Sequence, residues 1–294
     1  MELLRSLQFV PGNRRDMLEK SRTFDADVLV ADLEDSVPPA EKAAARELVR
    51  ELAPSLSGRD QKVVVRVNSL DTGLTADELE AIAGPHLYGV SLGKVDSPWH
   101  IQECHRLLET QESRLGMESG VIKIIPWIES AAGILRAADI ARASPRVVAL
   151  AFGAEDYTND MGIQRTDEGE EVRLPRSMVP IVAQAAGIVA LDTPYVKFRD
   201  REGLQREAEA ARRLGYKGKF AIHPVQLEII NTVFSPREED LEYARRVVEA
   251  WEQAEAQGRG ALALDGNMVD VPVVKRAYNI LKLAKQMAKR GRSE

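Results

Sequence analysis

The chain has 294 residues, of which 44% are hydrophobic and 29% charged, and its formal net charge is −6. This composition predicts an ordinary globular protein, and without a basic block interleaved with aromatic residues we expect no nucleic-acid partner. The first residues lack the apolar core of a signal peptide and no apolar run reaches membrane-spanning length, so we expect a cytoplasmic protein without a membrane partner. The single cysteine, Cys104, excludes an internal disulfide, and its surroundings favour a helix residue over a nucleophile.

Eight short apolar runs, rich in Val, Ile and Leu, alternate with helical patterns along most of the chain. They cover residues 6–10, 27–33, 62–67, 89–95, 121–125, 146–152, 187–194 and 219–224. Runs of this kind are typical of parallel strands that are buried on both faces. Eight alternations predict an α/β fold of the (β/α)8 type, a TIM barrel. A doubly wound sheet is the alternative, but no GxGxxG follows the first run.

The fifth run, "VIKIIPWIES", ends with a proline and then presents an acid. Pro126 cannot donate a hydrogen bond to a neighbouring strand, so we expect this strand to stop near Ile125. The segment 126–130 is then a loop, with Glu129 just beyond the strand.

The last 60 residues do not fit the repeat. They contain a long amphipathic pattern at 235–258, a hairpin-like segment with an Asp265-Gly266 turn, and a helix at 273–290. We therefore expect a barrel domain at 1–234 and a C-terminal helical and hairpin extension at 235–294. Appendages of this kind cap the mouth of a barrel or bridge subunits.

Polar side chains gather where the predicted strands end. Barrel enzymes carry their chemistry at the C-terminal ends of the strands. The residues at these ends are Asp32, Glu34, Asp35, Arg66, Asn68, Lys94, Asp96, Glu129, Glu155, Asp156 and His223. This ring of carboxylates with few cations favours a bound divalent cation.

Glu129 and Asp156 follow neighbouring predicted strands, which lie about 4.8 Å apart in a sheet. Two carboxylates so placed can share one ion, and ligation by oxygen alone indicates Mg²⁺. The alternative is that each acid merely favours the start of the following helix through the helix dipole.

Two basic features also lie at the C-terminal ends of the predicted strands. Arg66 interrupts the apolar run "VVVRVNS", where it either binds a substrate carboxylate or developing oxyanion, or forms a structural salt bridge with Glu34 or Asp35. In "FVPGNRRDMLEK", the start of a helix with Arg14, Arg15 and Lys20 either receives phosphates or forms a solvated basic face.

Seven segments, in order and spacing, resemble the citrate lyase β-subunit-like acyl-CoA lyases of the HpcH/HpaI aldolase superfamily, which include malyl-CoA and citramalyl-CoA lyases. The segments are "FVPGNRRDMLEKS", "DVLVADLEDSVPPAEKAAAR", "VVVRVNS", "PWIESAAGI", "AFGAEDYTNDMG", "KFAIHPVQLEIIN" and "DGNMVDVPVVKRA". They span residues 9 to 277, which is nearly the whole chain.

The resemblance implies a (β/α)8 barrel that assembles as a homotrimer or hexamer, with Mg²⁺ bound by Glu129 and Asp156 and with Arg66 on the substrate. It also implies a coenzyme A site lined by Phe9, Arg14, Ile222 and His223. Some members use a lysine or another polar residue early in the first helix. The residue at this place is Asp16, which departs from the family pattern.

The resemblance further implies that Asp270 is the catalytic acid/base, delivered by the C-terminal extension of a neighbouring subunit. The alternative is that Asp270 only caps the last helix. Asp265 is expected to serve as a turn residue.

The implied activity is reversible carbon–carbon cleavage of a 3-hydroxyacyl-CoA thioester to acetyl-CoA and a 2-oxo acid. Citramalyl-, malyl- and citryl-CoA all remain open as substrates. Three other possibilities stay open: a metal-dependent aldolase acting on a free pyruvate-type donor, a citrate lyase β subunit acting on an acyl-carrier-protein thioester, and a non-catalytic CoA-binding or assembly protein.

Overall fold

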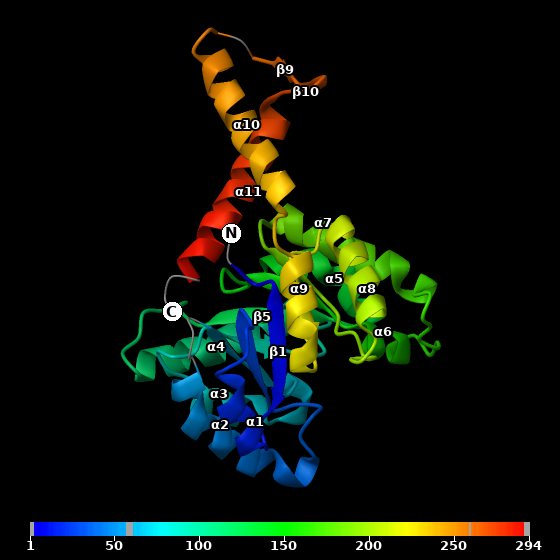
Figure 1. The fold of residues 1–294 in the computed structure, drawn as a ribbon. Coiled ribbons are helices and arrows are strands. Elements are labelled where there is room, and N and C mark those ends of the chain that lie inside the picture. Colours follow the sequence, from blue (N-terminus) through cyan, green and yellow to red (C-terminus); the bar gives the residue numbers. More distant parts are fainter. Residues whose placement is uncertain (1–2, 57–60, 259, 291–294) are drawn as a thin grey trace. The chain divides into compact units, whose positions relative to one another are not determined.

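Eight parallel strands form a closed barrel in which each strand pairs with its neighbour in the sequence and β8 pairs with β1 (Figure 1). The computed structural model describes residues 3–56, 61–258 and 260–290. The strands are β1 (Ser6–Pro11), β2 (Val28–Asp32), β3 (Lys62–Val67), β4 (Gly89–Leu92), β5 (Lys123–Ile128), β6 (Ala149–Phe152), β7 (Val189–Asp192) and β8 (Gly218–Ala221). The predicted (β/α)8 barrel is confirmed.

Helices follow the strands and surround the barrel (Figure 1). They are α1 (Arg15–Ser21), α2 (Lys42–Leu56), α3 (Thr75–Ile82), α4 (Pro98–Arg114), α5 (Ala131–Arg142), α6 (Ala154–Asp160), α7 (Arg173–Ala186), α8 (Arg201–Leu214) and α9 (Leu227–Val233). Short 3₁₀ turns at Pro39–Glu41, Leu70–Thr72, Glu170–Val172 and Pro224–Gln226 complete the connections. Because the chain enters a helix after every strand, all the strand ends that carry polar residues face the same side.

The interior of the barrel is filled by side chains from nearly every strand. The buried cluster consists of Leu4, Leu7, Val28, Val30, Val64, Ile125, Trp127, Ala149, Ala151, Val189, Leu191 and Phe220. Phe9 and Phe220 stack with their ring centroids 5.2 Å apart, and Trp127 lies 4.4 Å from Phe220. The indole N–H of Trp127 donates to Ser91 Oγ at 2.7 Å, which satisfies its polar group inside the core.

The prediction that the fifth strand stops near Ile125 is wrong. β5 continues through Pro126, which pairs with Leu92, to Trp127 and Ile128, which pair with β6. Pro126 removes one donor from the ladder, but the next two side chains are almost completely buried. Burial of these large apolar groups outweighs one missing hydrogen bond. Glu129 still stands just beyond the strand, one residue after its end.

Cys104 is a buried residue of α4, as its sequence surroundings predict. Burial raises the pKa of its thiol to about 12, so the thiol stays protonated at neutral pH. Within the ranges given above, no helix is both long and apolar enough to cross a membrane.

The chain divides into two compact units, one of residues Leu4–Asn231 and a second that begins at Thr232 and also includes Leu3. The expected domain boundary after residue 234 stays a prediction. The second unit contains α10 (Glu238–Glu255), the hairpin β9 (Leu262–Leu264) and β10 (Asn267–Val269), and α11 (Val271–Arg290). Asp265 and Gly266 have φ of 51° and 75°, as the predicted two-residue turn requires. Ala244 and Val247 of α10 pack with Val274 of α11 in a separate apolar cluster.

Candidate active site

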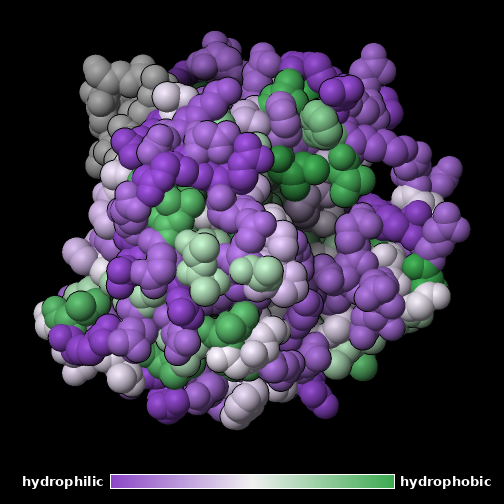
Figure 2. All heavy atoms as spheres, turned by 90° about the horizontal axis from the view of Figure 1, so that it is seen from below, coloured by the Kyte–Doolittle hydropathy of each residue, from purple (hydrophilic) through white to green (hydrophobic). Residues whose placement is uncertain are grey.

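A cavity of about 400 Å³ opens where the strands of the barrel end. Its lining consists of Phe9, Pro11, Asp32, Asp35, Ser36, Arg66, Trp127, Glu129, Gly153, Ala154, Glu155, Asp156, Thr193, Pro194 and Ile222. On the face that Figure 2 shows, hydrophilic side chains prevail, and hydrophobic groups gather beside a hollow in the surface. The structure thus brings five of the predicted site residues, Phe9, Arg66, Glu129, Asp156 and Ile222, into one cavity.

Arg66 is held by carboxylates from the end of β2. Its Nε and Nη2 atoms donate to the two carboxylate oxygens of Asp32, both at 2.7 Å. Its Nη1 atom lies 3.1 Å from Glu34 and 3.2 Å from Asp35. The structural salt bridge is therefore present, with Asp32 as the main partner, and the same guanidinium also lines the cavity and lies 4.6 Å from the Phe9 ring centroid.

This arrangement keeps the Arg66–Asp32 pair charged. Burial acts to raise the pKa of Asp32, but the hydrogen bonds and charge of Arg66 outweigh burial and hold that pKa below its ordinary value. For Arg66, burial lowers the pKa, yet Asp32 and its acidic neighbours raise it overall. A permanently charged guanidinium at the cavity wall suits an anionic substrate.

The pKa values of Glu129 and Asp156 are raised, in contrast to that of Asp32. Burial, followed by the charge of Asp156, raises the pKa of Glu129 to about 8. The pKa of Asp156, in the first turn of α6, is also raised, first by burial and then by Asp35. Two nearby carboxyl groups that resist ionisation are a typical arrangement for a site that receives a cation.

The backbone around Glu129 leaves room only because glycines stand there. A Cβ on Gly153 would collide with Oε2 and Cβ of Glu129, and a Cβ on Gly93 would lie 3.3 Å from Glu129 Oε1. The backbone N–H of Lys94 donates to Glu129 Oε1 at 2.6 Å, and Lys94 has φ of 55°, which is uncommon for a residue with a side chain. This left-handed conformation points the N–H of Lys94 at the carboxylate, so a strained backbone position orients Glu129.

The donors fit a hard divalent cation. Oε1 of Glu34 is buried without a hydrogen bond, and Lys94 Nζ lies 3.3 Å from it. Among the residues that the structure describes, no three His, Cys, Asp or Glu side chains are grouped closely enough to hold a metal. Glu129 and Asp156 would therefore supply two ligands and leave the others to water and substrate, which is the usual arrangement for Mg²⁺.

The raised pKa of Glu129 predicts how the stability of the metal-free protein depends on pH. Between its ordinary pKa of 4.5 and about 8, folded Glu129 keeps a proton that the unfolded chain has lost. Stability is therefore expected to fall as pH rises through this window and to stay low above it. Glu129→Gln should remove that loss and stabilise the metal-free protein by about 5 kcal/mol above pH 8, with little effect near pH 4.5.

Urea unfolding at several pH values in EDTA measures this difference. Identical pH profiles for wild type and variant would show that Glu129 ionises normally in the folded protein.

Two residues predicted to line the coenzyme A site are not part of this cavity. Arg14 is exposed and pairs with Asp16 at 3.0 Å, so the departure at position 16 occupies the arginine. His223 caps the turn at Pro224–Gln226, where its Nδ1 accepts from the N–H of Val225 at 3.2 Å, and its ring stacks on Phe198. Both side chains remain accessible on the strand-end side of the barrel.

Asp270 belongs to the C-terminal unit. Its Oδ1 accepts from the backbone N–H of Val273 at 3.3 Å, at the start of α11. The helix-capping alternative is therefore observed. A capping carboxylate keeps a second oxygen for other partners, so capping and an acid/base role are compatible.

Comparison with known proteins places the chain in a family. The family model described as HpcH/HpaI aldolase/citrate lyase matches residues 5–224. The chain belongs to this family. It is 38% identical over 282 residues to the citrate lyase subunit beta of Leuconostoc mesenteroides subsp. cremoris, covering 96% of this chain and 93% of that protein. The citrate lyase β-like lyase class that the sequence implies is confirmed.

Two further HpcH/HpaI relatives bear on the chemistry. A (3S)-malyl-CoA thioesterase of Cereibacter sphaeroides is 32% identical and covers 98% of this chain and 97% of its own length. A crystal structure of CitE from Mycobacterium tuberculosis, in complex with magnesium, acetoacetate and coenzyme A, matches with a TM-score of 0.77 and 34% identity. That match covers 95% of this chain and 97% of the CitE chain.

Proposed function

We propose that this protein is a Mg²⁺-dependent acyl-CoA lyase. It reversibly cleaves a carbon–carbon bond in a 3-hydroxyacyl-CoA thioester of the citramalyl, malyl or citryl type, and it yields acetyl-CoA and a 2-oxo acid. The observation that carries this proposal is the buried pair of Glu129 and Asp156, with raised pKa values, facing one cavity with the charged Arg66.

Relatives support the choice of ligands. The CitE structure contains magnesium and coenzyme A. A structure of a citrate lyase beta subunit from M. tuberculosis, with a TM-score of 0.64 and 32% identity, contains oxaloacetate and magnesium. Because citrate lyase β subunits are among the relatives, a β subunit that acts on an acyl-carrier-protein thioester stays the alternative function. The thioesterase relative makes hydrolysis a further outcome that an assay must distinguish.

The reaction breaks the bond between the α-carbon of the thioester and the carbinol carbon. The hydroxyl gives its proton to the Asp270 carboxylate and becomes the carbonyl of the 2-oxo acid, while the electron pair of the broken bond moves onto the thioester as an enolate. Mg²⁺ held by Glu129 and Asp156 would serve as a Lewis acid and a template for the carboxylate and the adjacent oxygen. Arg66 stabilises the negative charge that develops on the thioester oxygen. Asp270 then returns that proton to the α-carbon, which gives the acetyl group.

We propose that Asp270 acts on the active site of a neighbouring subunit in a homotrimer or hexamer. Asp270→Asn keeps an acceptor for the N–H of Val273 and should therefore fold normally. It is expected to lower kcat by about 10²–10⁴-fold, because it removes general acid–base catalysis. The measurement is acetyl-CoA release, with the melting temperature as the control for folding.

Mixing two inactive variants tests the arrangement in trans. Arg66→Ala and Asp270→Asn subunits, each inactive alone, should recover about a quarter of wild-type activity after exchange, because some interfaces then combine an intact Arg66 with an intact Asp270. No recovery in verified mixed oligomers would place both residues in the same subunit.

A substrate panel separates the candidate functions. Citramalyl-, malyl- and citryl-CoA, the matching acyl-carrier-protein thioesters, and free 4-hydroxy-2-oxo acids are each incubated with Mg²⁺. Acetyl-CoA and a 2-oxo acid in equal amounts from a CoA thioester support the proposal. Cleavage of the free acids alone would favour the aldolase, and free CoA without a 2-oxo acid would favour hydrolysis. Binding of CoA without any conversion would favour a non-catalytic protein.

A further inference from the structure

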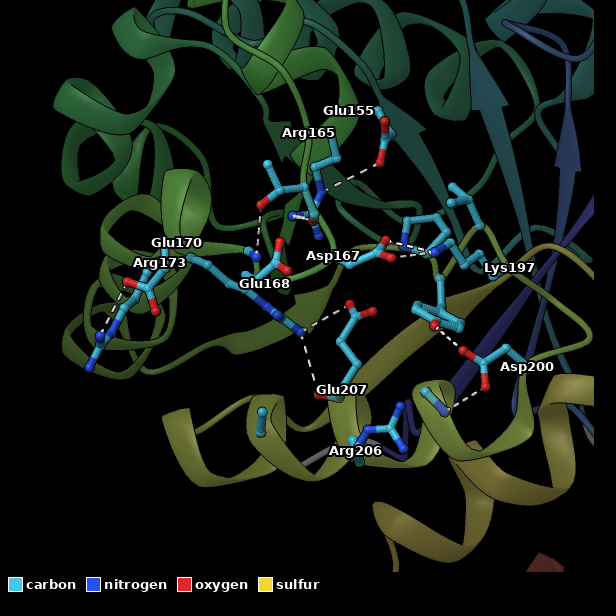
Figure 3. A pocket seen from close by; sticks show the side chains of 18 of the residues that line it. Glu155, Arg165, Asp167, Glu168, Glu170, Arg173, Lys197, Asp200, Arg206 and Glu207 are labelled. Carbon is cyan, nitrogen blue, oxygen red and sulfur yellow. Dashed lines mark hydrogen bonds and ion pairs between the residues drawn. The ribbon is translucent and has the colours of Figure 1, made fainter.

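A second cavity, of about 770 Å³, lies beside the candidate active site, and no step of the proposed reaction uses it (Figure 3). Its walls are the segment before α7, the start of α7, the loop between β7 and α8, and one face of α8. Glu155 and Pro194 line both cavities. The second cavity is thus a neighbour of the reaction site with a different lining.

The α8 wall carries two arginines that form only long ion pairs with neighbouring acids. Arg206 and Arg213 are seven residues apart on the lining face, which places them about 10.5 Å apart along the helix axis. The ion-pair partners that the described residues offer are Glu202 at 3.7 Å and Glu209 at 3.8 Å, each one turn back on α8. Exposed helical pairs at such distances contribute little, so both guanidinium groups are available to a ligand.

Arg176 adds a donor from inside the cavity. Only 9% of this residue is exposed. Its Nε and Nη2 atoms donate to Asp192 at 2.8 and 2.7 Å, and Nη2 also donates to Glu207 at 3.2 Å. Nη1 donates to no described residue and is not fully buried, and Arg176 is part of the cavity lining. A nearly buried guanidinium with free N–H groups calls for an acceptor oxygen.

Most acids around the cavity are already engaged. Asp167 pairs with Lys197 at 2.6 Å and Glu207 pairs with the buried Lys219 at 2.9 Å. Glu155 faces Arg165, Glu170 faces Arg173, and Asp200 accepts from Tyr195 and from the N–H of Gly203. Figure 3 shows the pairs of Asp167 with Lys197, Glu155 with Arg165 and Glu170 with Arg173, and it places Glu168 on the wall opposite Arg206. The available donors therefore concentrate on the α8 side.

We propose that this cavity binds a small organic anion with two or more charged groups, of the phosphate-ester or polycarboxylate class. Arg206 and Arg213 hold separate anionic groups of the ligand, and Nη1 of Arg176 donates to an oxygen between them. Arginine suits this role because its planar fork matches phosphate and carboxylate oxygens. The site is distinct from the cavity that contains Arg66, Glu129 and Asp156.

Isothermal titration calorimetry on the full-length protein, in metal-free buffer at low salt, tests the proposal. Pyrophosphate probes the phosphate class and tricarballylate the polycarboxylate class. We expect one saturable site per chain for at least one of them, weakened about tenfold or more by Arg206→Gln and by Arg213→Gln. Arg201→Gln is the matched control, because Arg201 lies on the same helix, pairs with Glu228 at 2.9 Å and does not line the cavity.

The proposal is overturned if neither anion binds, or if Arg206→Gln and Arg201→Gln weaken binding equally. It is also overturned if Arg66→Lys abolishes binding and Arg206→Gln does not, since the anion would then occupy the active-site cavity. Melting temperatures verify that each variant is folded. Because neither metal nor thioester is present, the result does not depend on the proposed lyase activity.

Discussion

Glu129→Gln is expected to abolish both Mg²⁺ binding and carbon–carbon cleavage while the protein stays folded. Glutamine preserves the size of the side chain and can still accept the N–H of Lys94, which now lies 2.6 Å from Glu129 Oε1. Glutamine cannot ionise, so the substitution removes one of the two carboxylates that are proposed to bind the metal. Loss of the Lewis acid should lower kcat/KM by about 10³-fold or more, which corresponds to several kcal/mol of transition-state stabilisation.

Mg²⁺ affinity from calorimetry and acetyl-CoA release from the best substrate measure the two effects separately. Asp156→Asn should behave in the same way, because Asp156 is the second proposed ligand. Asp139→Asn, on the exposed face of α5, is the control for loss of a carboxylate. A Glu129→Gln protein with wild-type Mg²⁺ affinity would remove Glu129 from the metal site.

Arg66→Ala is expected to damage both stability and activity. The guanidinium makes two hydrogen bonds to Asp32, whose side chain is almost completely buried, and faces Glu34, which is also buried. Removing one partner of a buried pair leaves an uncompensated charge and costs about 3–5 kcal/mol. Loss of the donors that stabilise developing charge should lower kcat by about 10²–10³-fold.

Arg66→Lys separates the two roles. Lysine restores the positive charge beside Asp32, so most of the stability should return in urea unfolding. It cannot reproduce the planar fork, so activity should stay low. If Arg66→Lys restores activity as fully as stability, the arginine serves only to neutralise the acids around it.

The fold was predictable because each local pattern was strong. Residues 62–67 are apolar except for Lys62 and Arg66, and they form β3. Residues 75–82 form α3. The end of β5 was not predictable by the same reasoning. From the sequence alone, we weighed only the N–H that Pro126 lacks. The folded chain also buries the side chains of Trp127 and Ile128, which favours a longer strand. Such a gain depends on contacts with β6 and the barrel interior, which lie far away in the sequence.

The candidate site was predictable at the level of residue types and strand ends. Glu129, Asp156 and Arg66 were found because acids and arginine are unusual beside apolar runs. Sequence reasoning did not identify Asp32 as the main partner of Arg66, since three acids lie at the end of β2 or just after it, and only the bidentate geometry distinguishes them.

Other site features depend on three-dimensional geometry. The left-handed backbone of Lys94 and the close approach of Gly153 to Glu129 arise from packing between neighbouring strand ends. The glycine before "AED" and the glycine before Lys94 were the available signals. Neither pattern indicates by itself which carboxylate it accommodates.

The most direct test of the proposed lyase is the metal dependence of product formation. Each thioester of the panel is incubated with the purified protein after EDTA treatment, and acetyl-CoA and 2-oxo acid are quantified before and after Mg²⁺ is restored. We expect no product in EDTA and equal amounts of both products after Mg²⁺ is added, for at least one CoA thioester. Equal rates with and without the metal, or no cleavage of any thioester by folded protein that binds CoA, would contradict the proposed function.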